Sequence, residues 1–78
     1  MPHISVKMLK GRTEEQKQKL TTALAEAMKE SLGVSDVHIS LTIEDYSAKE
    51  WQGVFKEEIT DKQKCLYKKP GYKPEDLL

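Results

Sequence analysis

Pro2 is the residue with the clearest chemical potential, because it directly follows the initial methionine. If Met1 is removed, the ring nitrogen of Pro2 becomes a secondary amine, which can act as a base or as a nucleophile. Inside a chain the same nitrogen is an amide and does neither. The alternative is that the proline is an arbitrary second residue. We take Pro2 as a candidate catalytic group and the rest of the chain as the scaffold that positions it.

The other residue types that commonly carry chemistry form no recognisable constellation. His3 and His38 fall where plain surface residues are expected, and no cluster of histidines, cysteines or carboxylates has metal-ligand spacing. The one cysteine, Cys65, cannot form an internal disulfide, and no neighbour that would activate it is visible. No glycine-rich phosphate loop is present. The sequence therefore points to no metal and no cofactor.

Length and charge restrict the classes of function. The 78 residues predict a single domain over residues 1–78, with a core so small that self-association would complete it. The 13 basic and 13 acidic residues give a formal net charge of zero, which argues against nucleic-acid binding and against a polybasic membrane patch. No signal peptide or membrane span is apparent, so we expect a cytoplasmic protein.

Alternating polarity and helical spacing predict the first three elements. Residues 3–9 alternate as a half-buried strand does, and residues 37–44 repeat the pattern. Between them, residues 13–16 form a capping box, an apolar stripe at helical spacing follows, and Gly33 suits a left-handed helix end. Two strands joined by such a helix form a βαβ unit with parallel strands. The sequence therefore predicts an α/β fold in which the helix covers one face of the sheet.

A second helix and a short tail complete the predicted fold. Residues 47–50 form another capping box, and apolar positions continue to Leu66 before the Lys-Lys-Pro-Gly-Tyr ending at 68–72. Gly53 is a point where this helix could bend. Residues 73–78 are a tail that either docks or stays loose. Because two strands do not make a stable sheet alone, we expect a second subunit to extend it.

These stretches together resemble one known family. The Met-Pro-His-Ile start at 1–4, the turn and helix entry at 9–17, the Ile-Ser-Leu strand at 39–41 and Trp51 are similar to the 4-oxalocrotonate tautomerase family. The ending at 66–72 is similar to its longer bacterial branch, the YdcE-type tautomerases. The resemblance covers the whole chain. It implies a tautomerase-like α+β unit whose sheet is completed by oligomerisation, with a homodimer favoured over a hexamer.

The resemblance also implies an activity, that of a cofactor-independent keto–enol tautomerase acting on a small 2-oxo acid or its enol. Pro2 would be the general acid/base, because an apolar site with nearby cations lowers the pKa of its conjugate acid. Arg12 matches the arginine that binds a substrate carboxylate, often at a site shared between subunits; a solvated turn arginine is the alternative. Trp51 matches an aromatic pocket wall, with core packing as the alternative, and Leu9 would line the same pocket.

The chain departs from the family pattern at Ser40, where the best-known members carry a second arginine. A neutral hydroxyl gives a weaker hydrogen bond than a guanidinium. We therefore expect Ser40 to bind substrate less strongly than an arginine would, and monoacids such as arylpyruvate enols to be preferred over dicarboxylates. His38, two residues earlier, is a candidate for a compensating role.

Two other functions stay open on the sequence alone. A hydratase or dehalogenase of the same superfamily would need an additional carboxylate to activate water, and Glu44 and Asp45 are the candidates. A non-catalytic oligomeric interaction module of the same fold would explain the missing second arginine. Retention of Met1 in cells would favour the module, and turnover that depends on Pro2 would exclude it.

Overall fold

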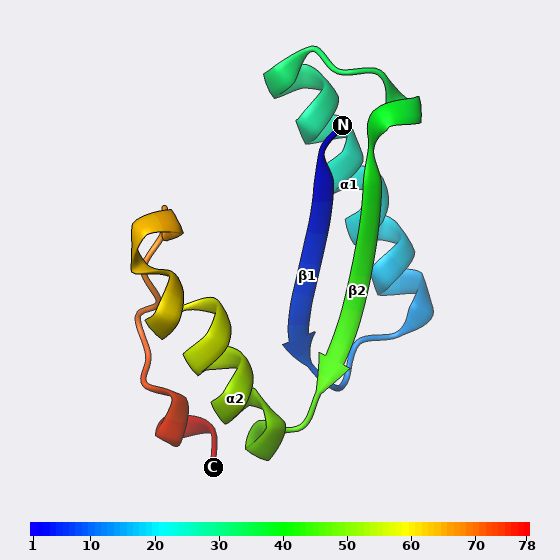
Figure 1. The fold of residues 1–78 in the computed structure, drawn as a ribbon. Coiled ribbons are helices and arrows are strands. Elements are labelled where there is room, and N and C mark those ends of the chain that lie inside the picture. Colours follow the sequence, from blue (N-terminus) through cyan, green and yellow to red (C-terminus); the bar gives the residue numbers. More distant parts are fainter.

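The computed structural model describes residues 1–78 as a βαβ unit followed by a second helix and a tail (Figure 1). The main elements are β1 (His3–Leu9), α1 (Glu14–Leu32), β2 (Ser40–Tyr46) and α2 (Ala48–Glu58). Three short 3₁₀ helices complete the order: Asp36–His38, Thr60–Cys65 and Pro74–Leu77. No helix is long and apolar enough to cross a membrane.

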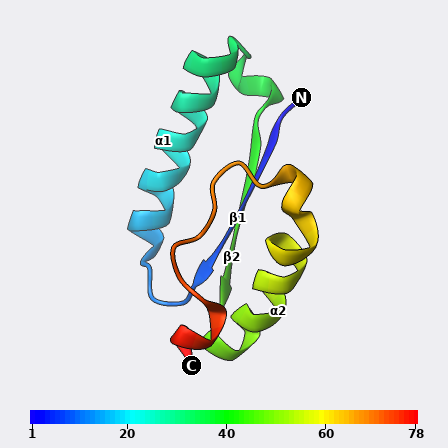
Figure 2. The same cartoon turned by 90° about the vertical axis from the view of Figure 1, so that its left-hand side faces the viewer.

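The two strands are parallel, as the βαβ prediction required. Their register runs from the pair His3–Ser40 to the pair Leu9–Tyr46, so both strands are paired over their full length. Helix α1 lies along one face of this two-stranded sheet, and α2 lies on the opposite side, near the carboxyl ends of the strands (Figures 1 and 2). Both faces of the sheet are therefore only partly covered.

The apolar face of the sheet is the one that α1 covers. Ile4 forms a shallow apolar hollow with Leu24, Met28 and Leu32 of α1. None of the 78 residues is fully buried in the isolated chain, and Leu32 keeps 61% of its surface exposed. A chain of this length buries a smaller share of its surface than a larger domain does. The hydrophobic face of α1 is thus half-buried at best within one copy.

The predicted caps of α1 are confirmed. The Thr13 hydroxyl accepts a hydrogen bond from the backbone N–H of Gln16 at 3.1 Å, and the Gln16 side chain accepts from the Thr13 N–H at 2.9 Å. At the other end Gly33 adopts φ 68°, a left-handed conformation that glycine reaches without steric cost, and its N–H donates to the Lys29 carbonyl at 2.9 Å. These local signals fix both ends of the helix.

The predicted start of the second strand is wrong. Residues Asp36–His38 form a 3₁₀ turn, held by hydrogen bonds from His38 N to Ser35 O and from Ile39 N to Asp36 O, and the strand begins at Ser40. The alternation of polarity runs through the turn, which made Val37 look like a core position, yet Val37 is 83% exposed. His38 is therefore a turn residue and does not lie on the polar face of a strand.

The predicted second helix is too long. Helix α2 ends at Glu58, and the backbone leaves helical geometry at Lys62, with φ −117° and ψ 35°. The Ile59 carbonyl accepts from the Lys62 backbone N–H at 3.3 Å and from the Gln63 side chain at 2.7 Å. Gly53 does not interrupt the helix. Cys65 lies exposed at the end of the following 3₁₀ segment rather than late in an α-helix.

We expect Ser47→Ala to lower the free energy of unfolding by about 1 kcal/mol, the usual cost of removing an N-cap hydroxyl. Ser47 accepts from the Glu50 N–H at 3.1 Å, and its own N–H donates to the Glu50 carboxylate at 2.8 Å. Urea denaturation at fixed protein concentration measures the change. Ser31→Ala, at an exposed serine outside any cap, is the matched control and should stay within about 0.5 kcal/mol of wild type. Equal stabilities of the two variants would contradict the cap.

The same cap gives stability a defined pH dependence. The backbone N–H of Ser47 holds the pKa of Glu50 below its ordinary value of 4.5. Because the folded pKa is the lower one, this contribution is fully present above the ordinary value and is lost as the pH falls through the lowered pKa. Glu50→Gln should remove this part of the acid-induced loss of stability.

Candidate active site

The structure places the candidate residues at the two ends of β1. Pro2 precedes the strand, whereas Leu9 ends it and Arg12 follows in the next turn. Seven residues at about 3.3 Å per residue separate the two ends by roughly 20 Å. Pro2 and Ser40 therefore lie together at one end, and Leu9, Arg12 and Trp51 gather at the other. Within one chain, the candidate base does not meet the candidate carboxylate-binding residue.

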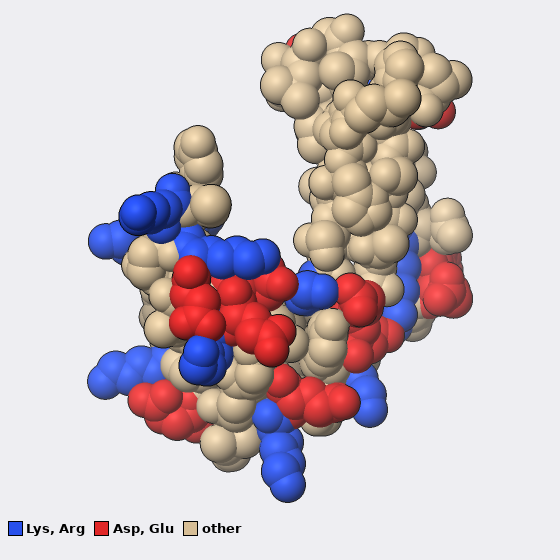
Figure 3. Space-filling model, viewed as in Figure 1, with Lys and Arg blue, Asp and Glu red and all other residues tan.

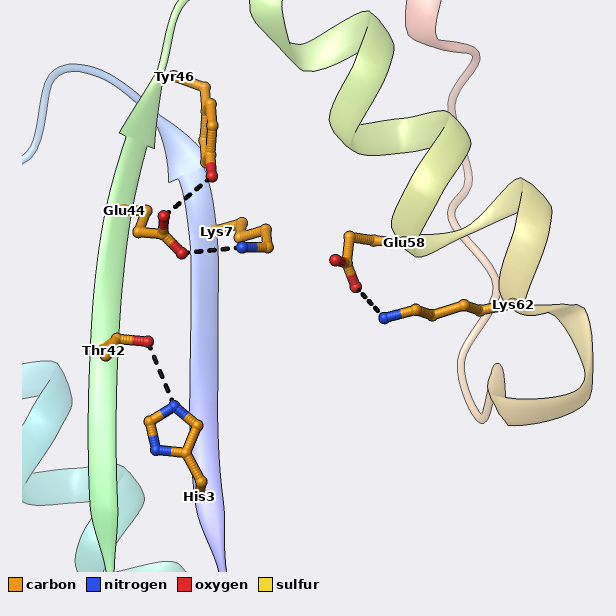
Figure 4. A network of polar contacts seen from close by, with 7 residues as sticks. All are labelled: His3, Lys7, Thr42, Glu44, Tyr46, Glu58 and Lys62. Carbon is orange, nitrogen blue, oxygen red and sulfur yellow. Dashed lines mark hydrogen bonds and ion pairs between the residues drawn. The ribbon is translucent and has the colours of Figure 1, made fainter.

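At the amino end, Ser40 lies directly beside Pro2. Its backbone N–H donates to the Pro2 carbonyl at 3.3 Å, and its hydroxyl oxygen lies 2.7 Å from Nδ1 of His3. The other ring nitrogen of His3 lies 3.5 Å from the Thr42 hydroxyl (Figure 4). His3 thus contacts the hydroxyl at the position where the sequence resemblance predicts a departure from the family's second arginine. The sequence alone indicates a plain surface residue at His3; the cross-strand register brings it to Ser40.

His38 does not join this group. Its Nδ1 lies 3.3 Å from the sulfur of Met1, which is itself 95% exposed. That contact is possible only while Met1 is present. The structure therefore gives no direct link between His38 and Ser40.

At the carboxyl end of β1, a pocket of about 310 Å³ combines apolar walls with two cations, of which Lys7 is ion-paired with Glu44 and Arg12 is not paired. Its lining residues are Lys7, Met8, Leu9, Arg12, Trp51, Tyr72 and Leu77. Arg12 is the only arginine in the chain, and every ion pair in the structure is made by a lysine instead. An unpaired guanidinium offers a fork of donors that matches a carboxylate. The pocket therefore suits a small acid with an apolar body.

Helix α2 and the C-terminal tail together hold the aromatic wall of this pocket. Trp51 belongs to the first turn of α2, which the Ser47 cap fixes, and its ring packs edge-on against Tyr46 with centroids 6.2 Å apart. The indole N–H of Trp51 donates to the Tyr72 hydroxyl at 2.8 Å. Tyr72 and Leu77 are pocket residues that the sequence alone did not indicate. The apolar residues of the tail were the only signal, and they did not show where the tail would dock.

A second hollow of similar volume lies between α2 and the sheet, and its electrostatics differ. Its lining includes Lys7 but also Glu50, Glu57 and Glu58. Figure 4 shows Lys7 already paired with Glu44, at 2.8 Å, and the Tyr46 hydroxyl donating to the same carboxylate. The hydrogen bond with Glu44 raises the pKa of Lys7, and the same bond lowers the pKa of Glu44. This hollow is acidic overall and does not suit an anion.

Both carboxylates considered for water activation are engaged. Glu44 pairs with Lys7, and Asp45 pairs with Lys17 of α1. The hydrogen bond with Asp45 raises the pKa of Lys17, which keeps this lysine charged. No group of three or more histidine, cysteine or acidic side chains in the structure is arranged to hold a metal ion.

Comparison with known proteins gives this arrangement its class, that of a small isomerase of the tautomerase type. Residues 2–57 match the sequence model of the family described as "Tautomerase enzyme". A probable tautomerase of Xylella fastidiosa is 38% identical over 73 residues, which are 92% of this chain and 89% of that protein. The 2-hydroxymuconate tautomerase of Bacillus subtilis is 49% identical over 45 residues, 58% of this chain and 73% of that protein.

Solved structures agree with the sequence matches. YwhB, a homologue of 4-oxalocrotonate tautomerase, superposes with a TM-score of 0.63 at 31% identity, over 99% of this chain and 100% of that one. A structure described for trans-3-chloroacrylic acid dehalogenase activity superposes with a TM-score of 0.60 at 35% identity, over 63% of this chain and 92% of that one. The chain belongs to the 4-oxalocrotonate tautomerase family, and the family resemblance of the sequence is thereby confirmed. It is a tautomerase-type enzyme, an isomerase.

Proposed function

We propose that the protein is a cofactor-independent keto–enol tautomerase of a small 2-oxo acid or its enol, with Pro2 as general acid/base after removal of Met1. The observation that carries this proposal is the unpaired Arg12 beside an aromatic-lined pocket, in a tautomerase-family chain whose second residue is proline. The cytoplasmic location expected from the sequence stays a prediction.

The proposed reaction moves one proton and needs no other reactant. The Arg12 fork holds the substrate carboxylate, while Trp51 and Leu9 exclude water from the substrate body. The neutral amine of Pro2 takes the proton from the enol oxygen and returns it to the far carbon of the enol double bond, so that the C=C bond is lost and the C=O bond of the ketone forms. The ring of Pro2 removes rotational freedom, so its lone pair keeps one direction. The Ser40 backbone pairs with that of Pro2, and the Ser40 hydroxyl would be the donor to the substrate oxygen whose charge changes.

This mechanism requires a second copy of the chain, because Pro2 and the Arg12 pocket lie at opposite ends of β1. A partner running antiparallel would bring its Pro2 to the pocket of the first copy. The surface supports such pairing: the face of the sheet turned away from α1 is almost free of charged side chains towards the amino ends of the strands, whereas charges gather around α2 (Figure 3). The lack of any fully buried residue in one copy supports it too. We propose a homodimer rather than a hexamer.

The proposed substrate class follows from Ser40. A neutral hydroxyl in place of a second arginine leaves the site with one strong carboxylate anchor, Arg12. A monocarboxylate with an aryl or other apolar body fits one unpaired cation and an apolar wall, whereas a dicarboxylate would leave one charge unpaired. His38 has no direct contact with Ser40 and is the weaker candidate for compensation.

The two alternatives carry different weights. One structural relative is described for trans-3-chloroacrylic acid dehalogenase activity, which favours keeping the hydratase or dehalogenase alternative. Glu44 and Asp45 are both ion-paired with lysines, however, which argues against a free base that would activate water. The non-catalytic interaction module predicts no turnover. The tautomerase proposal is therefore the one to test first.

The test is the ketonisation of phenylenolpyruvate, followed by loss of the enol absorbance, together with the intact mass of the protein. We expect a mass lacking one methionine, a rate above that of buffer that survives a chelator, and slow turnover of the family's dicarboxylate 2-hydroxymuconate. A protein with a free Pro2 that leaves both substrates at the buffer rate would exclude the tautomerase proposal and favour the interaction module.

A further inference from the structure

The wall of the Arg12 pocket that faces the tail is built by residues outside the family match. That match ends at residue 57, whereas Tyr72 and Leu77 both line the pocket. The tail is held in place by contacts with three residues of α2: the hydrogen bond from Trp51 to Tyr72 described above, and two more. The Gln52 side chain donates to the Pro74 carbonyl at 2.8 Å, and the Tyr72 ring packs edge-on against Phe55 with centroids 5.7 Å apart. The position of the tail is therefore specified rather than incidental.

The Tyr72 hydroxyl has an unused donor. It accepts the indole N–H of Trp51 at 2.8 Å, and it donates to no acceptor in the protein. A hydroxyl that accepts one hydrogen bond becomes a better donor for the next, because the two bonds polarise each other. This hydroxyl and the Arg12 guanidinium line the same pocket. A carboxylate has lone pairs left over after it accepts two N–H bonds from an arginine fork.

We propose that the C-terminal segment 66–78 determines substrate specificity, with Tyr72 donating a hydrogen bond to the carboxylate that Arg12 holds and Leu77 contacting an aryl body. This deepens the proposed function and rests on the Arg12 pocket as the substrate site. The ligand class is a single-ring aryl monocarboxylate. A pocket of about 310 Å³ lies at the small end of the range for ligand sites, roughly 300–1,000 Å³, and admits one ring with a short acid chain.

Two unreactive probes separate the two roles. The first is 3-phenylpropionate, which has a ring and a carboxylate, and the second is propionate, which lacks the ring. Trp51 is the only tryptophan, so its fluorescence reports binding in the pocket without any turnover. The titrations use the full chain with a free N-terminus in its native oligomeric state.

We expect Tyr72→Phe to weaken both probes by about tenfold, since a hydrogen bond to a charged group is lost while the ring keeps its contact with Phe55. Leu77→Ala should weaken 3-phenylpropionate by about threefold or more and leave propionate unchanged, because only the ring loses apolar contact. Tyr67→Phe is the matched control, since Tyr67 is fully exposed, and should change neither affinity. In turnover, Tyr72→Phe should raise KM with kcat nearly unchanged.

The affinities of the variants for the two probes show whether Tyr72 binds the ligand or only holds the tail in place. If Tyr72→Phe merely released the tail, it would reduce the preference for the ringed probe as Leu77→Ala does. A reduced preference for the ringed probe in Tyr72→Phe would overturn the proposal. So would wild-type affinity in both variants, or no binding of either probe to the wild-type protein. If the probes bound as expected but the protein showed no tautomerase activity, the proposed reaction would be wrong. The proposed roles of Tyr72 and Leu77 in binding the ligand would still hold.

Discussion

Pro2→Ala should lower kcat for the ketonisation of phenylenolpyruvate by about 100-fold or more, the range expected for loss of a positioned general acid/base. Alanine also permits removal of Met1, so the variant still begins with a free amine. That amine is primary and rotates freely, whereas the ring nitrogen of proline is secondary and fixed. The expected loss of kcat therefore measures how much the fixed secondary amine of proline contributes to the rate beyond a flexible primary amine. Stopped-flow or steady-state kinetics on the native oligomer gives the ratio.

A second variant isolates the nitrogen itself. One lysine inserted between Met1 and Pro2 prevents removal of the methionine and keeps Pro2 as an amide with its side chain intact. We expect at least as large a loss of kcat as in Pro2→Ala, because an amide nitrogen is not a base. The intact mass confirms the blocked end. If the blocked protein kept the wild-type rate, the base would have to be sought elsewhere, and Pro2 would have no part in the reaction.

The local structure of this protein was predictable because short-range chemistry dictates it. The capping boxes at Thr13 and Ser47 each need only a hydroxyl and a side chain three residues on, and Gly33 needs only its own conformational freedom. The parallel pairing of the strands followed from their polarity and the helix between them. Each of these signals lies within a few residues of the feature that it determines.

The errors arose where contacts distant in the sequence outweigh the local pattern. Alternation of polarity continued smoothly through Val37, but the chain must turn there to bring β2 alongside β1. Apolar positions continued beyond Glu58, but Ile59 caps the end of α2 and Leu66 follows the 3₁₀ segment, so neither belongs to a longer α2. The place of Tyr72 depends on its contacts with Trp51 and Phe55, about twenty residues earlier, and no local signal encodes it.

The candidate site was predictable as a set of residues, and its geometry was not. The sequence indicated Pro2, Arg12 and Trp51 through their family positions, and it indicated Ser40 through the departure from that pattern. That Pro2 lies at the opposite end of β1 from the Arg12 pocket follows from the strand itself. The two ends can meet only between two copies of the chain, and mixing variants of Pro2 and Arg12 tests whether they do.

Mixing two inactive variants, Pro2→Ala and Arg12→Ala, should restore activity. If each site takes Pro2 from one copy and Arg12 from another, random reassembly leaves about a quarter of the sites with both native residues. If each site were built within one chain, no mixture would contain an intact site. Equal amounts of the two variants are unfolded together in urea, refolded and assayed for ketonisation of phenylenolpyruvate. We expect a rate near a quarter of that of wild type treated in the same way.

The control for this mixture is a pairing that cannot make an intact site. Pro2→Ala mixed with the double variant Pro2→Ala/Arg12→Ala undergoes the same exchange but contains no native Pro2, so its rate should stay at that of the single variants. A restored rate in the first mixture alone requires both residues to meet across an interface, because subunit exchange without sharing restores nothing. If the first mixture stayed inactive although mass spectrometry showed mixed oligomers, Pro2 and Arg12 would have to act within one chain. The extended geometry of β1 opposes that arrangement, so this outcome would overturn the shared site together with the homodimer proposed to form it.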